Sequence, residues 1–408
     1  MGDSLKDYQF TVWGEFTPLA LQHQAVNLGQ GFPAFPAPSF IKEALYEGTM
    51  ADHNQYARIQ GFMPLVQQIA TVYSRKYARE VNPLTEVLVT FGGSEGLTLA
   101  FLGLLNPGEE AVLFDPSFDL YYPQASLAGA KVTAVPMHAP VEGSTVWEID
   151  WEAFESAFTP RTRLFVMNTP HNPLGKVYTP EELQRIADVL ERFPDVWIIS
   201  DEVYEHLVYG GREFRSIGTY GSLWSRCGML SSAGKLFSVT GWKTGWVVGG
   251  EQLIKKLTLV KQWTTFTSNT PCQYAVCKAL AIAEQPYLGF PTYYAWLHNE
   301  YDRKRLRLLT ILSTCQVAEL EPLQPEGGFF VIARIKSAPG LTAKDLENTS
   351  LDYALARWLT VQHRVTAIPC SSFFTAANKQ IGQTFLRFAL CKTDEDYEVA
   401  AQRLQCPH

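Results

Sequence analysis

Apolar stretches in this chain are all short. None approaches the ~18 consecutive apolar residues that a membrane-spanning helix needs, so we expect no membrane span. The seven cysteines are scattered and form no CxxC pair, which is typical of reduced thiols rather than of a disulfide framework or a zinc site. Acidic residues outnumber basic ones, 41 to 34, and no basic block is present, which disfavours binding to nucleic acid or to an anionic membrane surface.

The N-terminal residues contain no signal-peptide apolar region, and together with the unpaired cysteines this predicts a cytoplasmic protein. The 408 residues are enough for two or three packed units of ~150 residues each. Hydrophobic residues make up 46% of the chain and charged residues 18%, so the composition is that of a folded globular protein rather than a disordered one.

From about residue 85 the chain alternates short β-rich apolar runs with amphipathic segments. Strands that alternate with helices indicate βαβ units and a mostly parallel sheet covered on both faces. We therefore predict an α/β fold with a large domain over residues 45–290. Its strands are predicted at residues 87–91, 111–114, 131–136, 164–167, 196–200 and 229–232.

A different pattern follows residue 290. A long helix is predicted over residues 293–312, and helices over 350–363 and 394–404 interleave with strands. This pattern predicts a smaller α+β domain over residues 291–408. Residues 1–44 have no obvious core of their own, so we expect this segment to pack on the small domain and the substrate site. The strands of the small domain are predicted at residues 316–320, 328–335, 364–368 and 385–390.

Polar and glycine residues stand at the ends of four predicted strands. Because ligands of an open parallel sheet bind beyond the carboxyl ends of the strands, these positions are candidates for a site. Taken singly, each has a plain structural interpretation as a turn, a helix cap or a surface lysine. The glycine turn fits a phosphate at a helix N-terminus, although it is neither GxGxxG nor a P-loop motif. The segments are Phe91–Gly96, Asn168–Gly175, Asp201–Tyr204 and Ser232–Lys235.

Together these segments resemble the class I aminotransferases of fold type I, which depend on pyridoxal phosphate. Within that class the chain is most similar to the kynurenine/glutamine and methionine aminotransferase group. The resemblance runs over almost the whole chain and implies a central sheet of about seven mostly parallel strands. The matching residues are Asn27–Pro33, Gln55-Tyr56, Asn168–Gly175, Asp201–Tyr204, Ser232–Lys235, Gly241–Gly245 and Leu386–Phe388.

The resemblance implies how pyridoxal phosphate is held. Lys235 would bind the cofactor as a Schiff base, and its freed amine would then move the proton between Cα and C4′. Asp201 would keep the pyridine nitrogen protonated, while Asn172 and Tyr204 would hydrogen-bond the ring oxygen. The other cofactor-binding residues that it implies are Gly93, Ser94, Ser232, Lys243 and Tyr56 around the phosphate and Phe118 on the ring face.

The resemblance also implies a substrate site. Arg387 matches the arginine that clamps the substrate α-carboxylate, a task suited to its planar fork. Gly31, Asn172 and Trp13 would line the same site. Tyr56 and Phe266 match residues that reach the neighbouring subunit's active site, so a homodimer with composite sites is expected.

The activity implied is transfer of an amino group from an L-amino acid to a 2-oxo acid by a ping-pong mechanism. A neutral, sulfur-containing or aromatic side chain is favoured because no second arginine is evident for a distal carboxylate. Two other interpretations stay open at this point: a β-lyase that acts on cysteine conjugates with the same cofactor, and a non-catalytic ligand-sensing protein on the same fold. No metal site is predicted, since no second ligand lies at useful spacing from His171.

Overall fold

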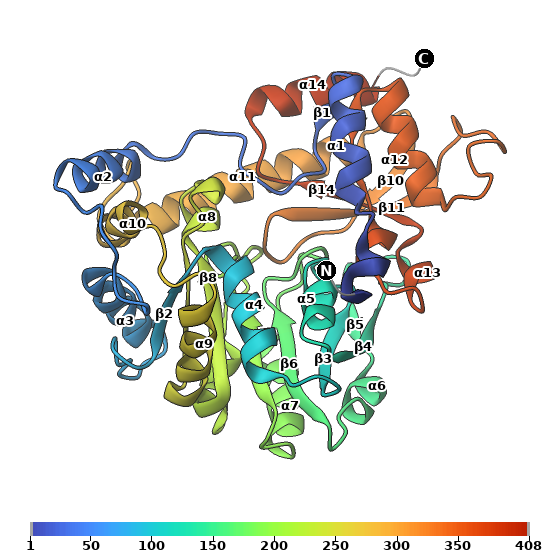
Figure 1. Cartoon of the computed structure of the whole chain (residues 1–408). Coiled ribbons are helices and arrows are strands. Elements are labelled where there is room, and N and C mark those ends of the chain that lie inside the picture. Colours follow the sequence, from blue (N-terminus) through green and yellow to red (C-terminus); the bar gives the residue numbers. More distant parts are fainter. Residues whose placement is uncertain (1–2, 406–408) are drawn as a thin grey trace.

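Eight strands form the central sheet of the larger domain in the computed structural model, which describes residues 3–405 (Figure 1). Strands β3, β4, β6, β7 and β8 run parallel, whereas β9 is antiparallel to β2 and β8, and β5 is antiparallel to β4. In spatial order the strands are β2 (Val87–Thr90), β9 (Gly245–Gly249), β8 (Cys227–Ser232), β7 (Trp197–Asp201), β6 (Thr162–Asn168), β3 (Glu110–Asp115), β4 (Lys131–His138) and β5 (Glu148–Ile149).

The mostly parallel α/β sheet that the sequence predicted is therefore confirmed. Two strands were not predicted. Strand β9 contains two glycines and forms no alternating pattern, although all five of its residues are buried. Strand β5 has only two residues and adds an edge strand beyond the about seven implied by the resemblance.

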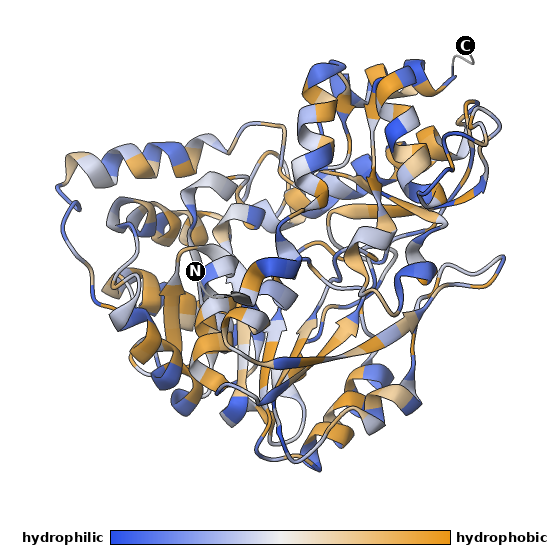
Figure 2. Ribbon diagram, turned by 45° about the vertical axis from the view of Figure 1, so that its right-hand side comes forward, coloured by the Kyte–Doolittle hydropathy of each residue, from blue (hydrophilic) through white to orange (hydrophobic). Residues whose placement is uncertain are grey.

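Alternate residues of the central strands pack on opposite faces of the sheet. Leu88 packs in the cluster that contains residues of α4 and α9, while its neighbours Val87 and Val89 pack with α3 on the other face. Figure 2 shows the strands of the sheet as mainly hydrophobic ribbons. The helices of this domain are α2 (Ser39–Met50), α3 (Met63–Lys76), α4 (Gly92–Leu104), α5 (Tyr121–Leu127), α6 (Trp151–Ser156), α7 (Pro180–Glu191), α8 (Ala233–Leu236), α9 (Glu251–Trp263) and α10 (Thr270–Ile282).

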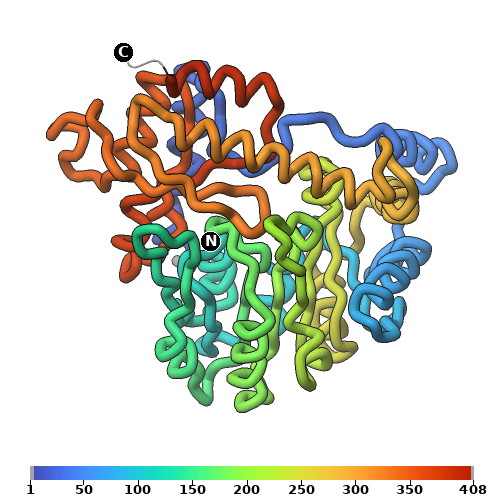
Figure 3. The backbone as a smooth tube through the Cα atoms, turned by 180° about the vertical axis from the view of Figure 1, so that it is seen from behind, coloured from blue at the N-terminus to red at the C-terminus, as the bar shows by residue number. Residues whose placement is uncertain are grey.

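The smaller domain is a four-stranded antiparallel sheet with helices packed around it. The long helix α11 connects the two domains, as the view from behind in Figure 3 shows. At its start, the hydroxyl of Tyr293 donates to the carbonyl of Leu236 in the larger domain at 2.9 Å. The sheet has the order β10 (Glu319–Pro322), β11 (Phe330–Ser337), β14 (Phe385–Ala389) and β13 (Ile368–Pro369), and the helices are α11 (Tyr293–Ser313), α12 (Leu351–Gln362), α13 (Lys379–Gly382) and α14 (Asp394–Gln405).

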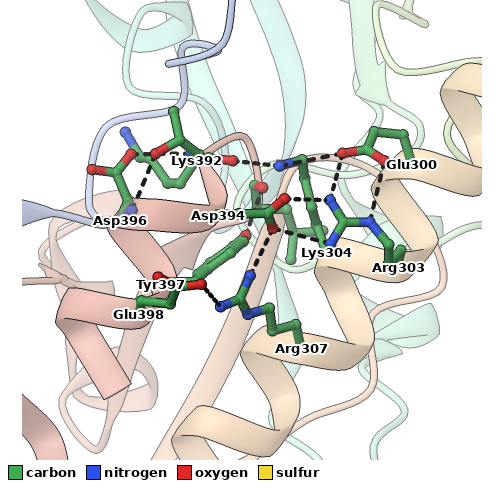
Figure 4. Close-up of polar contacts among 11 residues, drawn as sticks. Glu300, Arg303, Lys304, Arg307, Lys392, Asp394, Asp396, Tyr397 and Glu398 are labelled. Atoms are coloured by element: carbon green, nitrogen blue, oxygen red, sulfur yellow. Dashed lines mark hydrogen bonds and ion pairs between the residues drawn. The ribbon is translucent and has the colours of Figure 1, made fainter. Parts of the chain in front are cut away.

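Helices α11 and α14 are joined by a network of charges (Figure 4). Asp394, at the start of α14, accepts hydrogen bonds from Arg303 at 2.9 and 3.0 Å and from Arg307 at 2.7 Å. An acidic residue in the first turn of a helix also compensates the helix dipole. Lys304 donates to the carbonyl of Lys392 at 2.6 Å, which fixes the chain that leads from β14 into α14.

The N-terminal segment packs mainly on the smaller domain. Strand β1 (Val26–Asn27) pairs in parallel with β12 (Val365–Thr366), and Glu15 of α1 (Val12–Gln22) forms an ion pair with Arg357 of α12. Helix α2, in contrast, packs against α10 of the larger domain. Because α2 spans the predicted boundary at residue 44, we propose that the N-terminal segment ends before Ser39.

None of the helices within residues 3–405 is long and apolar enough to cross a membrane. The six cysteines in that range are free thiols. Cys406 and the other terminal residues of the predicted domains, 1–2 and 407–408, lie outside the described residues. Short 3-10 turns complete the fold: η1 (Asp3–Tyr8), η2 (Ile217–Thr219), η3 (Leu223–Arg226), η4 (Thr240–Trp242) and η5 (Cys370–Phe373).

Candidate active site

A cavity of about 560 Å³ lies at the carboxyl ends of β2, β6, β7 and β8, where the larger domain faces the smaller one. This is the position at which an open α/β sheet binds its ligands. The structure brings most of the predicted site residues together here. Those that line the cavity are Trp13, Gly31, Gly93, Ser94, Phe118, Asn172, Asp201, Tyr204, Ser232, Lys235, Lys243 and Arg387.

Lys235 stands on α8, directly after β8, and its side chain lines the cavity. Its Nζ donates to the carbonyl of Gly31 at 2.9 Å and lies 5.7 Å from the ring centre of Tyr204. Burial lowers the pKa of Lys235, and the positive charge of Arg387 acts in the same direction. A neutral amine is therefore more accessible here than on a surface lysine, as a nucleophilic lysine requires.

Asp201 is the last residue of β7 and is buried. Its carboxylate accepts a hydrogen bond of 2.7 Å from the hydroxyl of Tyr121 and a longer one of 3.4 Å from the amide of Val203. Burial raises the pKa of Asp201 to about 6, although both hydrogen bonds act against this shift. The carboxyl group is thus a fixed acceptor at the bottom of the cavity, suited to a protonated ring nitrogen.

The start of α4 places hydrogen-bond donors at one end of the cavity. Gly92 has φ +65°, a conformation that favours glycine, and a Cβ at this position would lie 3.5 Å from Nζ of Lys243. That Nζ donates to Oγ of Ser94 at 3.2 Å. Helix N-terminal amides, two hydroxyls from Ser94 and Ser232, and one ammonium group are the donors that a phosphate requires.

Arg387 lies on β14 of the smaller domain and is only 1% exposed. Its Nη2 donates to the carbonyl of Gly29 at 2.9 Å, and Phe330 packs against the guanidinium, with 3.9 Å between Cζ and the ring centre. Its Nε is buried without a hydrogen-bond partner among the described atoms. Burial lowers the pKa of Arg387 to about 10, which leaves it charged at neutral pH. A buried cation with an unused donor is suited to a carboxylate ligand.

Two asparagines connect these groups. The side-chain Oδ1 of Asn172 accepts from Nη1 of Arg387 at 2.8 Å. The backbone N–H of Asn172 donates to Oδ1 of Asn168 at 2.6 Å. Asn168 in turn donates from Nδ2 to the carbonyl of Asp201 at 2.8 Å. The loop after β6 is therefore held between Arg387 on one side and the end of β7 on the other.

Aromatic side chains enclose the cavity. The ring of Phe118 stands edge-on to Tyr121, with 5.8 Å between their centres. Tyr204 packs against Phe329 at 4.8 Å, and its burial raises the pKa of its hydroxyl well above the ordinary value. These rings provide apolar walls for a planar aromatic ligand.

The N-terminal segment contributes Trp13 and Gly31 to the cavity. Nε1 of Trp13 donates to Asp119 at 2.6 Å. A Cβ at Gly31 would come within 2.4 Å of the Phe330 ring, so this close approach of the backbone requires glycine. The segment therefore lines this cavity as well as packing on the smaller domain.

Tyr56 and Phe266 lie outside the cavity of their own chain. Their rings form an edge-to-face pair with 5.6 Å between centres, and the side chains are 83% and 45% exposed. The position of Phe266 is unusual, because its φ is +64°.

Two polar residues of the cavity region, Tyr121 and Asp119, were not predicted from the sequence, and Asn168 was predicted only as part of the segment Asn168–Gly175, without a role of its own. Asn168 stands at the end of a predicted strand, so its position could have identified it. Tyr121 lies 80 residues before Asp201. Nothing in the spacing of the two residues indicates that they meet, and their contact depends on the pairing of β3 with β6 and of β6 with β7.

Comparisons with known proteins give a consistent result over nearly the whole chain. A family model described as aminotransferase class I and II matches residues 23–404. The kynurenine–oxoglutarate transaminase of Dictyostelium discoideum is 38% identical over 413 residues, covering 97% of this chain and 93% of that protein. Among solved structures, an N-succinyldiaminopimelate aminotransferase from Mycobacterium tuberculosis is 32% identical with a TM-score of 0.88, covering 99% of both chains. An Escherichia coli protein with a methionine aminotransferase function is 31% identical with a TM-score of 0.85, covering 97% of both chains.

Proposed function

We propose, because the chain belongs to the aminotransferase class I and II family, that the cavity at the carboxyl ends of β2, β6, β7 and β8 is its active site. The protein is a pyridoxal-phosphate-dependent aminotransferase that uses a 2-oxo acid, and this confirms the prediction from the sequence motifs. The observation that supports the location of the site is the meeting, in one cavity, of the Lys235 amine, the Asp201 carboxylate and the anion-binding start of α4.

The residues of the cavity fit pyridoxal phosphate. The start of α4, with Ser94, Ser232 and Lys243 beside it, offers the donors that would bind the phosphate. Phe118, Val203, Asn172 and Tyr204 line the cavity; the first two would contact the ring faces, and the last two would donate to the ring oxygen. The volume of about 560 Å³ is within the range of small-molecule sites.

When bound, pyridoxal phosphate supplies an electron-accepting ring that makes the Cα proton of an amino acid acidic. Asp201 holds a proton on the ring nitrogen, and Tyr121 keeps the carboxylate ionised and correctly oriented by donating to it. Lys235, with its lowered pKa, would take the proton from Cα and deliver it to C4′. The carbonyl of Gly31, which accepts from Nζ in the free protein, holds the amine at the substrate side of the cavity.

Arg387 would bind the α-carboxylate of the substrate, for which its Nε is an unused donor. The substrate's side chain is neutral, sulfur-containing or aromatic, because the cavity is lined by Trp13, Phe118 and Phe330 and by no second arginine among its described residues. The names of the relatives make kynurenine and methionine the first donors to test.

The active enzyme is a homodimer in this proposal. Tyr56 and Phe266 form an exposed aromatic pair outside their own cavity, and Trp263, at the end of α9, is 77% exposed. Exposed aromatic clusters of this kind are typical of subunit interfaces. We also propose a cytoplasmic location, since the six described cysteines are free thiols, as in proteins of a reducing compartment.

The proposed function is tested by the visible absorbance of the purified protein. A cofactor band is expected that shifts when methionine or kynurenine is added and returns when a 2-oxo acid is added. Lys235→Ala should lose the response, whereas Lys255→Ala, on the exposed side of α9, should keep it. A protein that takes up no cofactor, or whose spectrum does not respond to any amino acid, would contradict the proposal.

A further inference from the structure

Lys261 is a fully buried lysine in the last turn of α9, and the proposed transfer chemistry gives it no role. Its Nζ donates to Oε2 of Glu95, in the first turn of α4, at 3.0 Å and to Oγ of Ser268 at 2.9 Å. Burial lowers the pKa of Lys261, while the charge of Glu95 acts against this shift. The two side chains form a buried ion pair between helices that pack against each other (Figure 1), and it is the only ion pair of Glu95 among the described residues.

Glu95 is tied to the end of the cavity at which the phosphate would bind. Its Oε2 also accepts from the backbone N–H of Phe91 at 2.6 Å, and the hydroxyl of Thr265 donates to its other carboxylate oxygen. Gly92 and Ser94, which stand between Phe91 and Glu95 in the chain, line the cavity. A carboxylate therefore lies within one helical turn of the groups proposed to bind the phosphate.

An unpaired carboxylate at this place would oppose an anion. A phosphate monoester carries about −1.5 to −2 charges at neutral pH, and like charges in a partly buried site repel more strongly than in water. A negative charge in the first turn of a helix also cancels part of the dipole that attracts an anion there. Because Lys261 compensates Glu95, the start of α4 and the ammonium of Lys243 keep an excess of positive potential at the phosphate end.

We infer that Lys261 is a positioning residue for the cofactor phosphate, acting by neutralising Glu95 in the first turn of α4. Lys261 itself does not line the cavity, so it acts through Glu95 and does not touch the cofactor. The inference rests on the proposed function and deepens it, because it gives a buried ion pair outside the cavity a part in cofactor binding. Charge compensation requires that removal of the two charges changes phosphate binding in opposite directions.

The test titrates the full chain, freed of cofactor, with pyridoxal phosphate and with pyridoxal, which has a hydroxyl in place of the phosphate. Absorbance gives the Kd for each. Lys261→Met removes the positive charge and leaves that of Glu95, so the Kd for pyridoxal phosphate should rise on the order of tenfold. The Kd for pyridoxal should stay within about twofold of the wild-type value, since pyridoxal has no phosphate to be repelled.

Glu95→Gln keeps an acceptor for the N–H of Phe91 but removes the negative charge. This variant should bind pyridoxal phosphate at least as tightly as wild type, although it leaves Lys261 unpaired. The double variant Lys261→Met/Glu95→Gln removes both charges and should return the Kd to within about threefold of the wild-type value. Lys255→Met, on the exposed side of α9, is the matched control and should change neither Kd.

Thermal stability alone does not separate the two explanations, because each single variant leaves one buried charge unpaired and should unfold more readily. If Lys261→Met does not fold, Lys261→Gln, which keeps a donor for Ser268, takes its place with the same expected result.

Three results would overturn the inference while leaving the proposed function intact: an equal loss of affinity for both ligands in Lys261→Met, no recovery in the double variant, or weaker phosphate binding in Glu95→Gln. The equal loss would mean that the pair only holds α4 and α9 together. A wild-type protein that binds neither pyridoxal phosphate nor pyridoxal would instead contradict the proposed function.

Discussion

Nη1 of Arg387 donates to Oδ1 of Asn172 across 2.8 Å, from β14 of the smaller domain to the loop after β6 of the larger one. Because Oδ1 of Asn172 accepts this bond, the NH₂ group of the same amide is left to donate to the cofactor ring oxygen. The residue proposed to bind the substrate thus orients a residue proposed to bind the cofactor. This bond between the domains links the geometry of the two sites.

Replacing Arg387 by lysine should weaken substrate binding. Lysine loses the planar fork and the bond to Asn172, and charge-assisted bonds of this kind contribute about 2–3 kcal/mol. The expected result is a decrease of about 100-fold in kcat/KM, mainly through KM, with the cofactor retained. Steady-state kinetics with methionine measure the effect. Arg334→Lys, on the neighbouring strand β11 and outside the cavity, is the matched control; an equal loss there would contradict the assignment.

Tyr121→Phe should alter the pH dependence of the reaction. Without the hydroxyl, Asp201 loses its 2.7 Å hydrogen bond, and its pKa rises above the value of about 6 that burial gives it. Asp201 then stays protonated up to a higher pH. The acidic limb of the kcat/KM profile should shift upward, and the rate at neutral pH should fall on the order of tenfold. An unshifted profile would mean that Tyr121 only fills space.

The fold was largely predictable from the sequence, and the contacts within the site were not. Strand-terminal residues such as Asp201 and Lys235 were found because ligands bind at one edge of a parallel sheet, a rule that needs no coordinates. The family motifs supplied Arg387, whose strand lies in another domain. Tyr121 was missed because its contact with Asp201 depends on the order of strands, which local patterns do not contain.

The predicted boundary at residue 44 followed from the lack of a core pattern before it. We propose an earlier boundary, because α2 packs against α10, which follows more than 200 residues later. A two-residue strand such as β5 has too few positions to show alternation at all.

Asp201→Asn should stabilise the cofactor-free protein in a pH-dependent manner. Burial raises the pKa of Asp201 from 3.8 to about 6, so the ionised form destabilises the folded state. That cost is absent below pH about 4, where the group is protonated in both states, and complete above pH about 6. At pH 8 the free energy of unfolding of the variant should therefore exceed that of wild type by about 1–3 kcal/mol, which raises its unfolding temperature. At pH 4 the two proteins should be equally stable. A gain that does not depend on pH would contradict the assigned shift.

Mixed dimers test whether the site is composite. Lys235→Ala and Tyr56→Ala should each be nearly inactive, but in a mixed dimer one site combines an intact Lys235 with the intact Tyr56 of the other chain. Random mixing should recover about a quarter of the wild-type activity. Mixing Lys235→Ala with Asp201→Asn is the control and should recover nothing, since both residues serve the cavity of their own chain. Recovery in the control, or none in the test, would contradict the exchange of Tyr56.

Borohydride reduction of the cofactor-loaded protein, followed by digestion and mass spectrometry, tests the role of Lys235 most directly. Reduction makes the link between the cofactor and its lysine permanent, so the modified peptide identifies the residue. Fragmentation of the modified peptide is expected to place the cofactor mass on Lys235 and not on Lys243, and no peptide of Lys235→Ala should carry it. Modification of a different lysine in the wild-type protein, or of none, would contradict the account.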